Sequence, residues 1–335
     1  MRAVRLHEVN GPQALRVDEV DRPHPAAGEV LVRLRAGALN HRDLFITRGL
    51  YPNIALPASL GSDGAGEVAE CGAQVTSVRA GDAVVIDPML GWGDDPRVWS
   101  AKASILGMPH PGTLADYIVV PAGNVYPKPA HLAFEAAAAL PLGGLTAYRA
   151  LVTRGAVARG ETVLLTGAGG GVQTFALLFA KALGARVIAT TGGAQKCARA
   201  LALGADVAID YRADAQWAKS ARAAAPEGIA LAVDSVGGET FAKMLTAVRP
   251  GGRVVTYGGT SGDATLKMFP IFWNHLTICG TSMGSPADFA GMLALVSGER
   301  LEPIVDRVFA LEEIVAAAQR LERGEQFGKV VVSIA

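Results

Sequence analysis

Short apolar segments alternate with segments of helical periodicity between residues 162 and 257, and this alternation most restricts how the chain folds. The sequence predicts buried strands at 162–166, 186–190, 206–210, 229–234 and 252–257, with helices at 173–183 and 196–203. Right-handed crossovers join strands that alternate with helices in this way, and they give a parallel sheet covered by helices on both faces. We therefore expect a doubly wound α/β domain in this part of the chain.

The chain before this region has a different pattern, in which short β-branched segments lie between glycines and prolines. Strands are expected at 29–35 and 82–87, a long surface loop at 88–111, and helices at 132–139 and 311–321, with a last strand at 329–334. A length of 335 residues suits two domains. The sequence thus predicts a β-rich domain beside the α/β domain.

Composition favours a globular enzyme of the cytoplasm. Half of the residues are apolar and the formal net charge is zero, which argues against broad binding to nucleic acid or to an anionic membrane surface. No apolar run reaches the roughly 20 residues that span a bilayer, and the first residues lack the apolar core of a secretory signal. Cys71, Cys197 and Cys279 are scattered, as expected for reduced thiols that pack as small apolar residues.

A glycine-rich turn follows the first strand of the α/β region and begins its first helix. Its candidate cofactor-binding residues are Gly167, Gly169, Gly170, Gly171 and Val172. Glycines let the backbone approach a pyrophosphate, and the free N–H groups of the helix N-terminus attract the negative charge. The segment departs from the G-x-G-x-x-G pattern because Gln173 stands where the third glycine is expected. A flexible turn between strand and helix is the alternative.

The end of the next strand discriminates between the two nicotinamide cofactors. Enzymes that use NAD place an acidic residue there to hold the ribose 2′-hydroxyl, whereas this chain has Thr191 followed by two glycines. The absence of an acid leaves room for the 2′-phosphate of NADP, which Thr191 and Lys196 are placed to bind. A solvated helix lysine is the alternative for Lys196.

Several ordered motifs resemble the medium-chain dehydrogenase/reductase superfamily, in particular its zinc-independent quinone oxidoreductase-like branch. They are 38–44 (ALNHRDL), 61–68 (GSDGAGEV), 140–148 (LPLGGLTAY), the glycine turn, 180–185 (AKALGA) and 328–331 (GKVV). The resemblance implies a GroES-like β-rich catalytic domain at 1–123, to which 283–335 returns. It also implies a Rossmann domain at 124–282 with a doubly wound parallel sheet in the strand order 3-2-1-4-5-6.

The resemblance also implies roles for individual residues. Asn40 is expected to face the nicotinamide ribose and the substrate, and Tyr51 to line the substrate pocket as a candidate donor to the carbonyl. The remaining residues that the resemblance or their strand-end position assigns to the cofactor are Thr146, Tyr211, Val236, Gly258, Gly259 and Lys329. Local alternatives stay open, since Asn40 also suits a backbone-capping amide, Tyr51 a packed loop tyrosine and Lys329 a surface lysine.

The zinc-binding members of this superfamily take a cysteine where this chain has Asn40, and a His-Glu pair where it has Ser62 and Asp63. A catalytic zinc requires about three suitable protein ligands, so no zinc is expected. Without a Lewis acid, an alkoxide is not stabilised before hydride leaves. The sequence therefore predicts NADPH-dependent reduction of an activated small molecule, a quinone or an α,β-unsaturated carbonyl.

Two other functions remain open at this point, an enoyl-thioester reductase and a cofactor-binding protein with a structural or RNA-binding role, which the zero net charge disfavours. Members of the family are usually dimers or tetramers. The apolar segment 275–280 is β-prone, and we expect it at the sheet edge that pairs across a two-fold axis of a homodimer or homotetramer.

Overall fold

A computed structural model describes residues 1–334 and divides the chain into two compact units. The first unit comprises Met1–Gly143 and the segment that begins at Ser285, and the second comprises Gly144–Gly284. Within residues 1–334, no helix combines the length and apolar character needed to cross a membrane. All three cysteines are free and half-buried, as expected for packed thiols.

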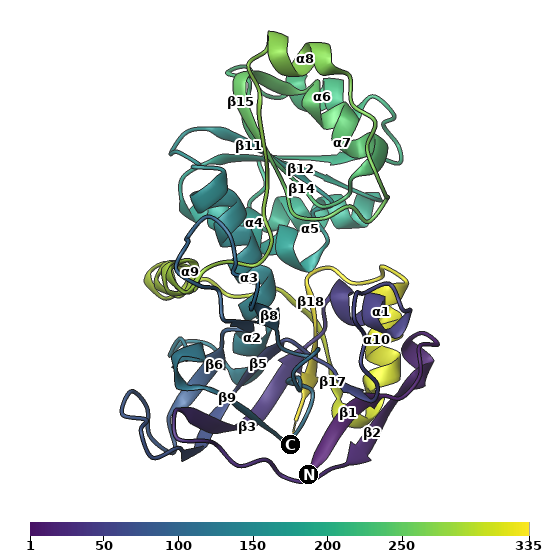
Figure 1. The fold of residues 1–335 in the computed structure, drawn as a ribbon. Helices are drawn as coiled ribbons and strands as arrows, with labels where there is room; N and C mark the ends of the chain where they lie inside the picture. The colour runs from purple at the N-terminus through teal and green to yellow at the C-terminus, as the bar shows by residue number, and fades with distance from the viewer. Residues whose placement is uncertain (335) are drawn as a thin grey trace. The chain divides into compact units, whose positions relative to one another are not determined.

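The first unit is built on a seven-stranded sheet in the order β10-β6-β5-β3-β18-β17, with β9 paired to β3 (Figure 1). Its strands are β3 (Glu29–Ala38), β5 (Asp63–Cys71), β6 (Ala83–Ile86), β9 (Tyr117–Pro121), β10 (Val125–Pro127), β17 (Val305–Ala310) and β18 (Lys329–Ser333). β3 lies in the interior of the sheet, and most of its residues are buried. It pairs antiparallel with β5, with β9 and with β18, which comes from the end of the chain.

Two smaller sheets and five helices complete this unit. The sheets consist of β1 (Arg2–Leu6), β2 (Leu15–Glu19) and β4 (Ala58–Ser59), and of β7 (Met89–Leu90) and β8 (Ser104–Ile105). The helices are α1 (His41–Thr47), α2 (Phe134–Ala139), α9 (Pro286–Gly298) and α10 (Ile314–Glu322), with α3 (Pro141–Tyr148) leading into the second unit. Apolar side chains of α10, β18 and β3 share one core, which fixes the C-terminal segment to the N-terminal sheet.

The second unit contains one parallel sheet in the order β13-β12-β11-β14-β15-β16. The strands are β11 (Thr162–Thr166), β12 (Arg186–Thr191), β13 (Val207–Asp210), β14 (Ile229–Asp234), β15 (Val248–Thr256) and β16 (Thr277–Gly280). The helices are α4 (Gly171–Ala182), α5 (Ala194–Ala202), α6 (Trp217–Ala223), α7 (Gly238–Leu245) and α8 (Met268–Trp273), and a π-helical segment, Arg149–Arg154, precedes them. Helices α4 and α5 cover one face of the sheet, and α6 and α7 the other (Figure 1).

The predicted fold class is confirmed: a doubly wound parallel sheet in the order 3-2-1-4-5-6 accompanies a β-rich unit. The segment 275–280 supplies the edge strand β16, as expected. The first domain, however, extends beyond residue 123, because β10 pairs with β6 and α2 packs on the same sheet.

Two further expectations need correction. The segment 88–111 is only partly a surface loop, because it forms β7 and β8 and buries Trp92, Leu106 and Met108. A second helix, α9, stands before α10 in the C-terminal segment. The Asp288 carboxylate accepts hydrogen bonds from the Ser285 N–H and Oγ–H at its start, and Pro286 occupies its first turn.

Candidate functional site

Asn40 lies between β3 and α1, where it is the N-cap residue of the helix with extended backbone angles. The Asp43 carboxylate accepts a hydrogen bond from the Asn40 N–H at 2.8 Å, so Asp43 helps to cap the helix. The buried amide of Asn40 makes no capping bond of its own. Its side chain is consequently available to other partners.

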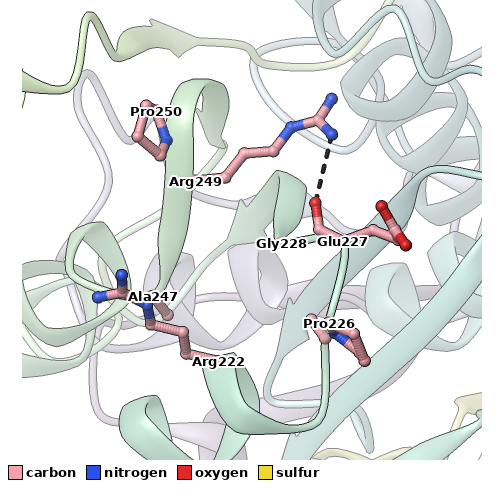
Figure 2. A pocket seen from close by; sticks show the side chains of 8 residues that line it. Arg222, Pro226, Glu227, Gly228, Ala247, Arg249 and Pro250 are labelled. Atoms are coloured by element: carbon pink, nitrogen blue, oxygen red, sulfur yellow. Dashed lines mark hydrogen bonds between the residues drawn. The ribbon is translucent and has the colours of Figure 1, made fainter.

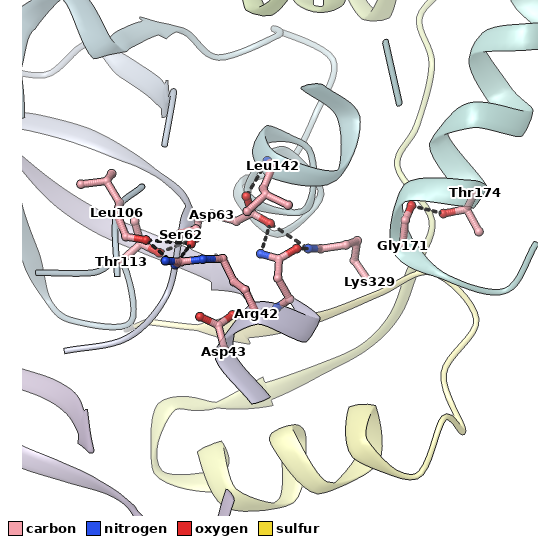
Figure 3. A network of polar contacts seen from close by, with 11 residues as sticks. Arg42, Asp43, Ser62, Asp63, Leu106, Thr113, Leu142, Gly171, Thr174 and Lys329 are labelled. Carbon is pink, nitrogen blue, oxygen red and sulfur yellow. Dashed lines mark hydrogen bonds and ion pairs between the residues drawn. The ribbon is translucent and has the colours of Figure 1, made fainter. Parts of the chain in front are cut away.

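Those partners are Asp63 and Lys329, and together the three residues form a buried group that we call the ammonium cluster (Figure 3). Lys329 Nζ donates to Asn40 Oδ1 at 2.6 Å and to Asp63 Oδ2 at 2.7 Å. Asn40 Nδ2 donates to the same Asp63 oxygen at 2.9 Å, and the Leu142 N–H donates to Asp63 Oδ1 at 2.6 Å. Lys329 is only 3% exposed and Asp63 is fully buried.

The pairing of three strands brings the cluster together. Asp63 begins β5 and lies opposite Ala38 of β3, two residues before Asn40. Lys329 begins β18, whose Val331 also pairs with Ala38. The sheet register therefore places an acid, an amide and an ammonium at one end of three adjacent strands.

Arg42 forms a second buried cationic centre beside the cluster. Its Nη1 donates to Ser62 Oγ at 2.6 Å and to the Leu106 carbonyl at 2.7 Å. Its guanidinium carbon lies 5.0 Å from the centroid of the Tyr51 ring. The half-buried Tyr51 packs against the apolar core of the first unit, so its ring has a structural contact while its proposed role at a carbonyl stays a prediction.

These contacts test whether the positions that resemble zinc ligands suit a metal ion. Asn40 and Asp63 both accept from the Lys329 ammonium, and Ser62 accepts from Arg42. An amide and a hydroxyl are poor ligands for zinc, and a fixed cation already occupies the acceptor atoms. Within residues 1–334, no three His, Cys, Asp or Glu side chains gather as a metal site requires. The residues present do not fit a catalytic zinc.

The glycine-rich turn lies between β11 and α4 in the second unit. Gly167 has a φ of +72°, which favours glycine, and Gly170 donates its N–H back to the Gly167 carbonyl at 3.0 Å. Gln173, in place of the third glycine, is buried, and its Nε2 donates to the Val233 carbonyl of β14 at 3.1 Å. The longer side chain thus joins the helix to the sheet where a glycine would only let them approach.

Two side chains lie over the backbone at the end of β12. A methyl group at Gly192 would come within 2.8 Å of Arg212 Nε and 2.9 Å of the Tyr211 hydroxyl. The resemblance implies Tyr211 as a cofactor-binding residue, whereas nothing in the sequence points to Arg212. The arginine lies 20 positions beyond Gly192 and approaches it only through the pairing of β12 with β13. Thr191 is buried and Lys196 is half-buried on α5.

Asp210 is an acidic residue that lies opposite Thr191 in the pairing of β12 with β13. Its Oδ1 accepts from the N–H groups of Gly193 and Arg212 at 2.9 and 3.0 Å, and these backbone hydrogen bonds lower the pKa of its carboxyl group. The carboxylate thus holds the backbone of the loops that follow β12 and β13.

The remaining predicted residues of the second unit also follow strand ends, apart from Thr146, which is buried on α3. Val236 Cγ2 lies 3.6 Å from the Cβ that a side chain at Gly167 would carry, and Gly258 lies beside Ser235. A Cβ at Gly237 would come within 2.9 Å of Gly259 Cα. The carboxylate of buried Asp234 accepts from Thr166 Oγ1 and from the Gly237 N–H, which joins β11 and β14 at their carboxyl ends.

A surface pocket also lies in the second unit, lined among others by Arg222, Glu227 and Arg249 (Figure 2). It adjoins the residues that precede β14 and β15. No residue assigned to the cofactor lines it. The pocket is therefore separate from the predicted site, which uses the opposite ends of the strands.

Two family models match the chain, "Alcohol dehydrogenase GroES-like domain" over residues 26–130 and "Zinc-binding dehydrogenase" over residues 171–298. The zinc-type alcohol dehydrogenase-like protein YogA of Leptosphaeria maculans is 34% identical, with 96% of this chain and 94% of that protein covered. The chain belongs to the medium-chain dehydrogenase/reductase superfamily.

Other members of the superfamily differ in what their names say of their chemistry. Quinone oxidoreductase 1 of Escherichia coli is 36% identical over 62% of this chain and 58% of its own. A crystal structure described as an NAD-dependent alcohol dehydrogenase is 39% identical, with a TM-score of 0.95 and full coverage of both chains. A 2-octenoyl-CoA carboxylase reductase in complex with NADP and 2-octenoyl-CoA is 26% identical over 99% of this chain and 87% of its own, with a TM-score of 0.89.

Membership of this superfamily makes the chain an oxidoreductase that uses a pyridine nucleotide. We expect such a cofactor to lie along the glycine turn, the two loops that meet at Gly192 and the strand ends around Val236 and Gly258. Asn40, Tyr51 and Lys329 belong to the first unit, and the other predicted residues to the second. Their individual roles stay predictions.

Proposed function

We propose that this protein is a zinc-independent, NADPH-dependent reductase of quinones or α,β-unsaturated carbonyl compounds. The observation that carries the proposal is the ammonium cluster, in which Asn40 and Asp63 bind Lys329 Nζ at 2.6 and 2.7 Å. In this chain the Lys329 ammonium occupies the side-chain oxygens that a zinc ion would need. The Lewis acid that stabilises an alkoxide in a zinc dehydrogenase is then missing. A substrate that already accepts hydride readily does not need that assistance.

The preference for NADPH is argued from the charges after β12 and β13. Thr191 replaces the acid that holds a ribose 2′-hydroxyl, while Arg212 lies over Gly192 and Lys196 stands on the helix that follows. Arginine and lysine suit a 2′-phosphate, which an acid at Thr191 would repel. The structure with NADP and 2-octenoyl-CoA supports this choice, and the NAD-dependent name of another similar structure makes it the first point to test.

Bound NADPH would supply the hydride, and the chain would supply binding and orientation. The backbone of the residues from Gly167 to Val172 would hold the pyrophosphate, and Thr146, Tyr211, Val236, Gly258 and Gly259 would line the rest of the cofactor. Asn40, held by Asp63, would orient the ribose and the substrate. The Tyr51 hydroxyl would donate a hydrogen bond to the carbonyl oxygen of the substrate.

The decay of NADPH absorbance with a panel of quinones and enones tests the proposal, with simple alcohols plus NADP⁺ as the contrasting reaction. We expect turnover of the first group and none of the second, unchanged after treatment with a strong metal chelator. Zinc-dependent alcohol oxidation would refute the proposal. Tight NADPH binding without turnover of any acceptor would favour a cofactor-binding structural protein instead.

An enoyl thioester is a second candidate substrate, because the 2-octenoyl-CoA reductase covers nearly the whole chain. A 2-enoyl-CoA added to the same panel separates the two substrate classes. A kcat/KM well above that of the free enone would favour the thioester.

We also propose a homodimer or homotetramer, formed through the edge of the parallel sheet. Among residues 1–334, β16 pairs only with β15. The preceding α8 exposes four large apolar side chains, each more than half accessible: Met268, Phe269, Phe272 and Trp273. When two copies of an open edge strand pair antiparallel across a two-fold axis, their free backbone N–H and C=O groups form hydrogen bonds with each other. A cluster of exposed aromatic side chains marks an interaction surface. Light scattering should show a dimer or tetramer for the wild type and a smaller species for Phe269→Ser/Trp273→Ser.

The cytoplasmic location stays a prediction.

A further inference from the structure

We propose that the Lys329 ammonium is the group that stabilises the oxyanion formed on the substrate when hydride is added. This inference rests on the proposed function. It gives Lys329 a role at the substrate oxygen, whereas the resemblance assigns this lysine to the cofactor.

The count of hydrogen bonds at Nζ is the first argument. An ammonium has three N–H donors, and those of Lys329 have two acceptors among the residues that the structure describes, Asn40 Oδ1 and Asp63 Oδ2. The side chain is 3% exposed, so bulk water is a poor third acceptor. A buried cation with one donor unused is suited to an anionic oxygen, for which a desolvated hydrogen bond from a cation is strong.

The rigidity of the cluster is the second argument. Asp63 accepts from three donors, namely Lys329, Asn40 and the Leu142 N–H, so its charge is shared and its orientation is fixed. Asn40 is fixed in turn by the start of α1 through Asp43. Because both acceptors are held, the direction of the third N–H is fixed before a substrate binds, which removes the cost of reorganisation during the reaction.

The chemistry balances with one proton taken from water, which leaves hydroxide in the solvent. Hydride from the dihydronicotinamide forms a C–H bond at the β-carbon, and the C=C pair moves so that the carbonyl oxygen becomes an enolate oxyanion. The cofactor is oxidised to NADP⁺ and the substrate is reduced by two electrons. Lys329 keeps its three protons and donates one hydrogen bond to the oxyanion, while water supplies the proton that the α-carbon takes up.

Steady-state kinetics of Lys329→Met and Lys329→Arg test the proposal, with NADPH affinity measured separately by fluorescence. Lys329→Met should lower kcat by about 100-fold or more while the Kd for NADPH changes by less than about threefold. Lys329→Arg, which keeps the cation, should recover part of kcat. Lys181→Met is the control, because it removes a Lys–Asp pair of similar length, with Asp206 at 2.8 Å, from a partly exposed place in the second unit. A variant with raised Kd for NADPH and normal kcat would overturn the proposal.

Loss of Lys329 leaves the buried Asp63 carboxylate unpaired and can impair folding. The double variant Lys329→Met/Asp63→Asn removes both charges and provides a second comparison. Thermal unfolding and NADPH binding show whether each variant is folded, and the kcat of the double variant should still be about 100-fold low.

A binding experiment separates this proposal from the proposed function. 4-Nitrophenolate mimics an enolate oxyanion and reports its charge by its visible absorbance, and it requires no turnover. The NADP⁺ complex of the wild type should lower the pKa of the bound phenol by about one unit or more, and the folded Lys329→Met complex should not. If the wild type reduces no quinone or enone, the proposed function fails and this measurement still decides the role of the ammonium. No binding to the wild type, or equal binding to both, would refute that role.

Discussion

Lys329 Nζ and Asn40 Oδ1 lie 2.6 Å apart although 289 positions separate the two residues in the chain. The contact joins the first residue of β18 to the N-cap residue of α1. The Asn40 amide therefore links two elements of the fold and also holds the ammonium for which we propose a function. Its removal should therefore affect stability and activity together.

Asn40→Ala removes an acceptor from the ammonium and a donor from the Asp63 carboxylate. We expect the free energy of unfolding to fall by about 1–3 kcal/mol, as for other buried polar groups that lose a partner, and kcat to fall as well. Urea unfolding and steady-state kinetics measure the two effects. Asn124→Ala removes two hydrogen bonds to the carbonyls of Asp87 and Met89 and should lower stability alone. Unchanged kcat in Asn40→Ala would argue against a role at the reaction centre.

Arg212→Ser should weaken NADPH binding by about tenfold and leave NADH binding nearly unchanged, because the guanidinium is expected to contact only the 2′-phosphate. Fluorescence titration with both cofactors measures the ratio. Arg222→Ser, an exposed arginine beside the pocket at the other end of the strands, is the control. Equal losses for NADPH and NADH would place Arg212 elsewhere than at the 2′-position.

Asp87 should make the protein less stable as the pH rises toward neutrality. Burial raises the pKa of this carboxyl to about 7, although the Met89 N–H hydrogen bond opposes the shift. Because the pKa in the folded state exceeds the unfolded value of about 4, the contribution of Asp87 is present below pH ~4 and is lost as the pH rises through about 7.

Asp87→Asn should consequently be more stable than the wild type at pH 8, by up to about 4 kcal/mol, and should lack this part of the pH dependence. Denaturant unfolding between pH 5 and pH 8 provides the comparison. The exposed Asp94→Asn is the control. The prediction is contradicted if the free energy of unfolding of the wild type does not decline relative to that of Asp87→Asn over this range. Ionisation of the buried Asp87 carboxyl would then cost little free energy.

Gln173→Gly restores the glycine of the usual fingerprint and should nevertheless destabilise the protein. It deletes the hydrogen bond to the Val233 carbonyl and leaves a cavity under α4, for a loss of about 2–3 kcal/mol. The midpoint of thermal unfolding measures the loss. Gln195→Gly, at an exposed position near the start of α5, tests the backbone effect of glycine alone. A stable Gln173→Gly variant would mean that helix and strand move together to close the gap.

The parallel sheet was predictable because its strands are short apolar runs that alternate with helices, a pattern local in sequence. The same reasoning placed the glycine turn and the edge segment 275–280. It missed α9, whose apolar residues surround the helix and give no periodic face. It also assigned 88–111 to the surface, since an irregular segment that buries Trp92 and Met108 has no strand or helix periodicity.

The site was predictable only in part. The motifs indicate Asn40 and Lys329 as site residues and Asp63 only as a replaced zinc-ligand position. The contact among the three depends on the register of β3, β5 and β18. Arg212 was missed for the same reason, because only the pairing of β12 with β13 brings it to Gly192. When two residues meet only because distant strands pair, a single sequence contains no pattern that reveals their contact.

The position of β18 has a consequence for biosynthesis. A ribosome completes residues 144–284, and with them every strand of the second unit, before it adds Lys329. Until then β3 lacks its β18 neighbour, and Asp63 is a carboxylate without its cation. The nascent chain can therefore form its parallel sheet early, whereas the charged centre of the first unit assembles only after β18 has been synthesised.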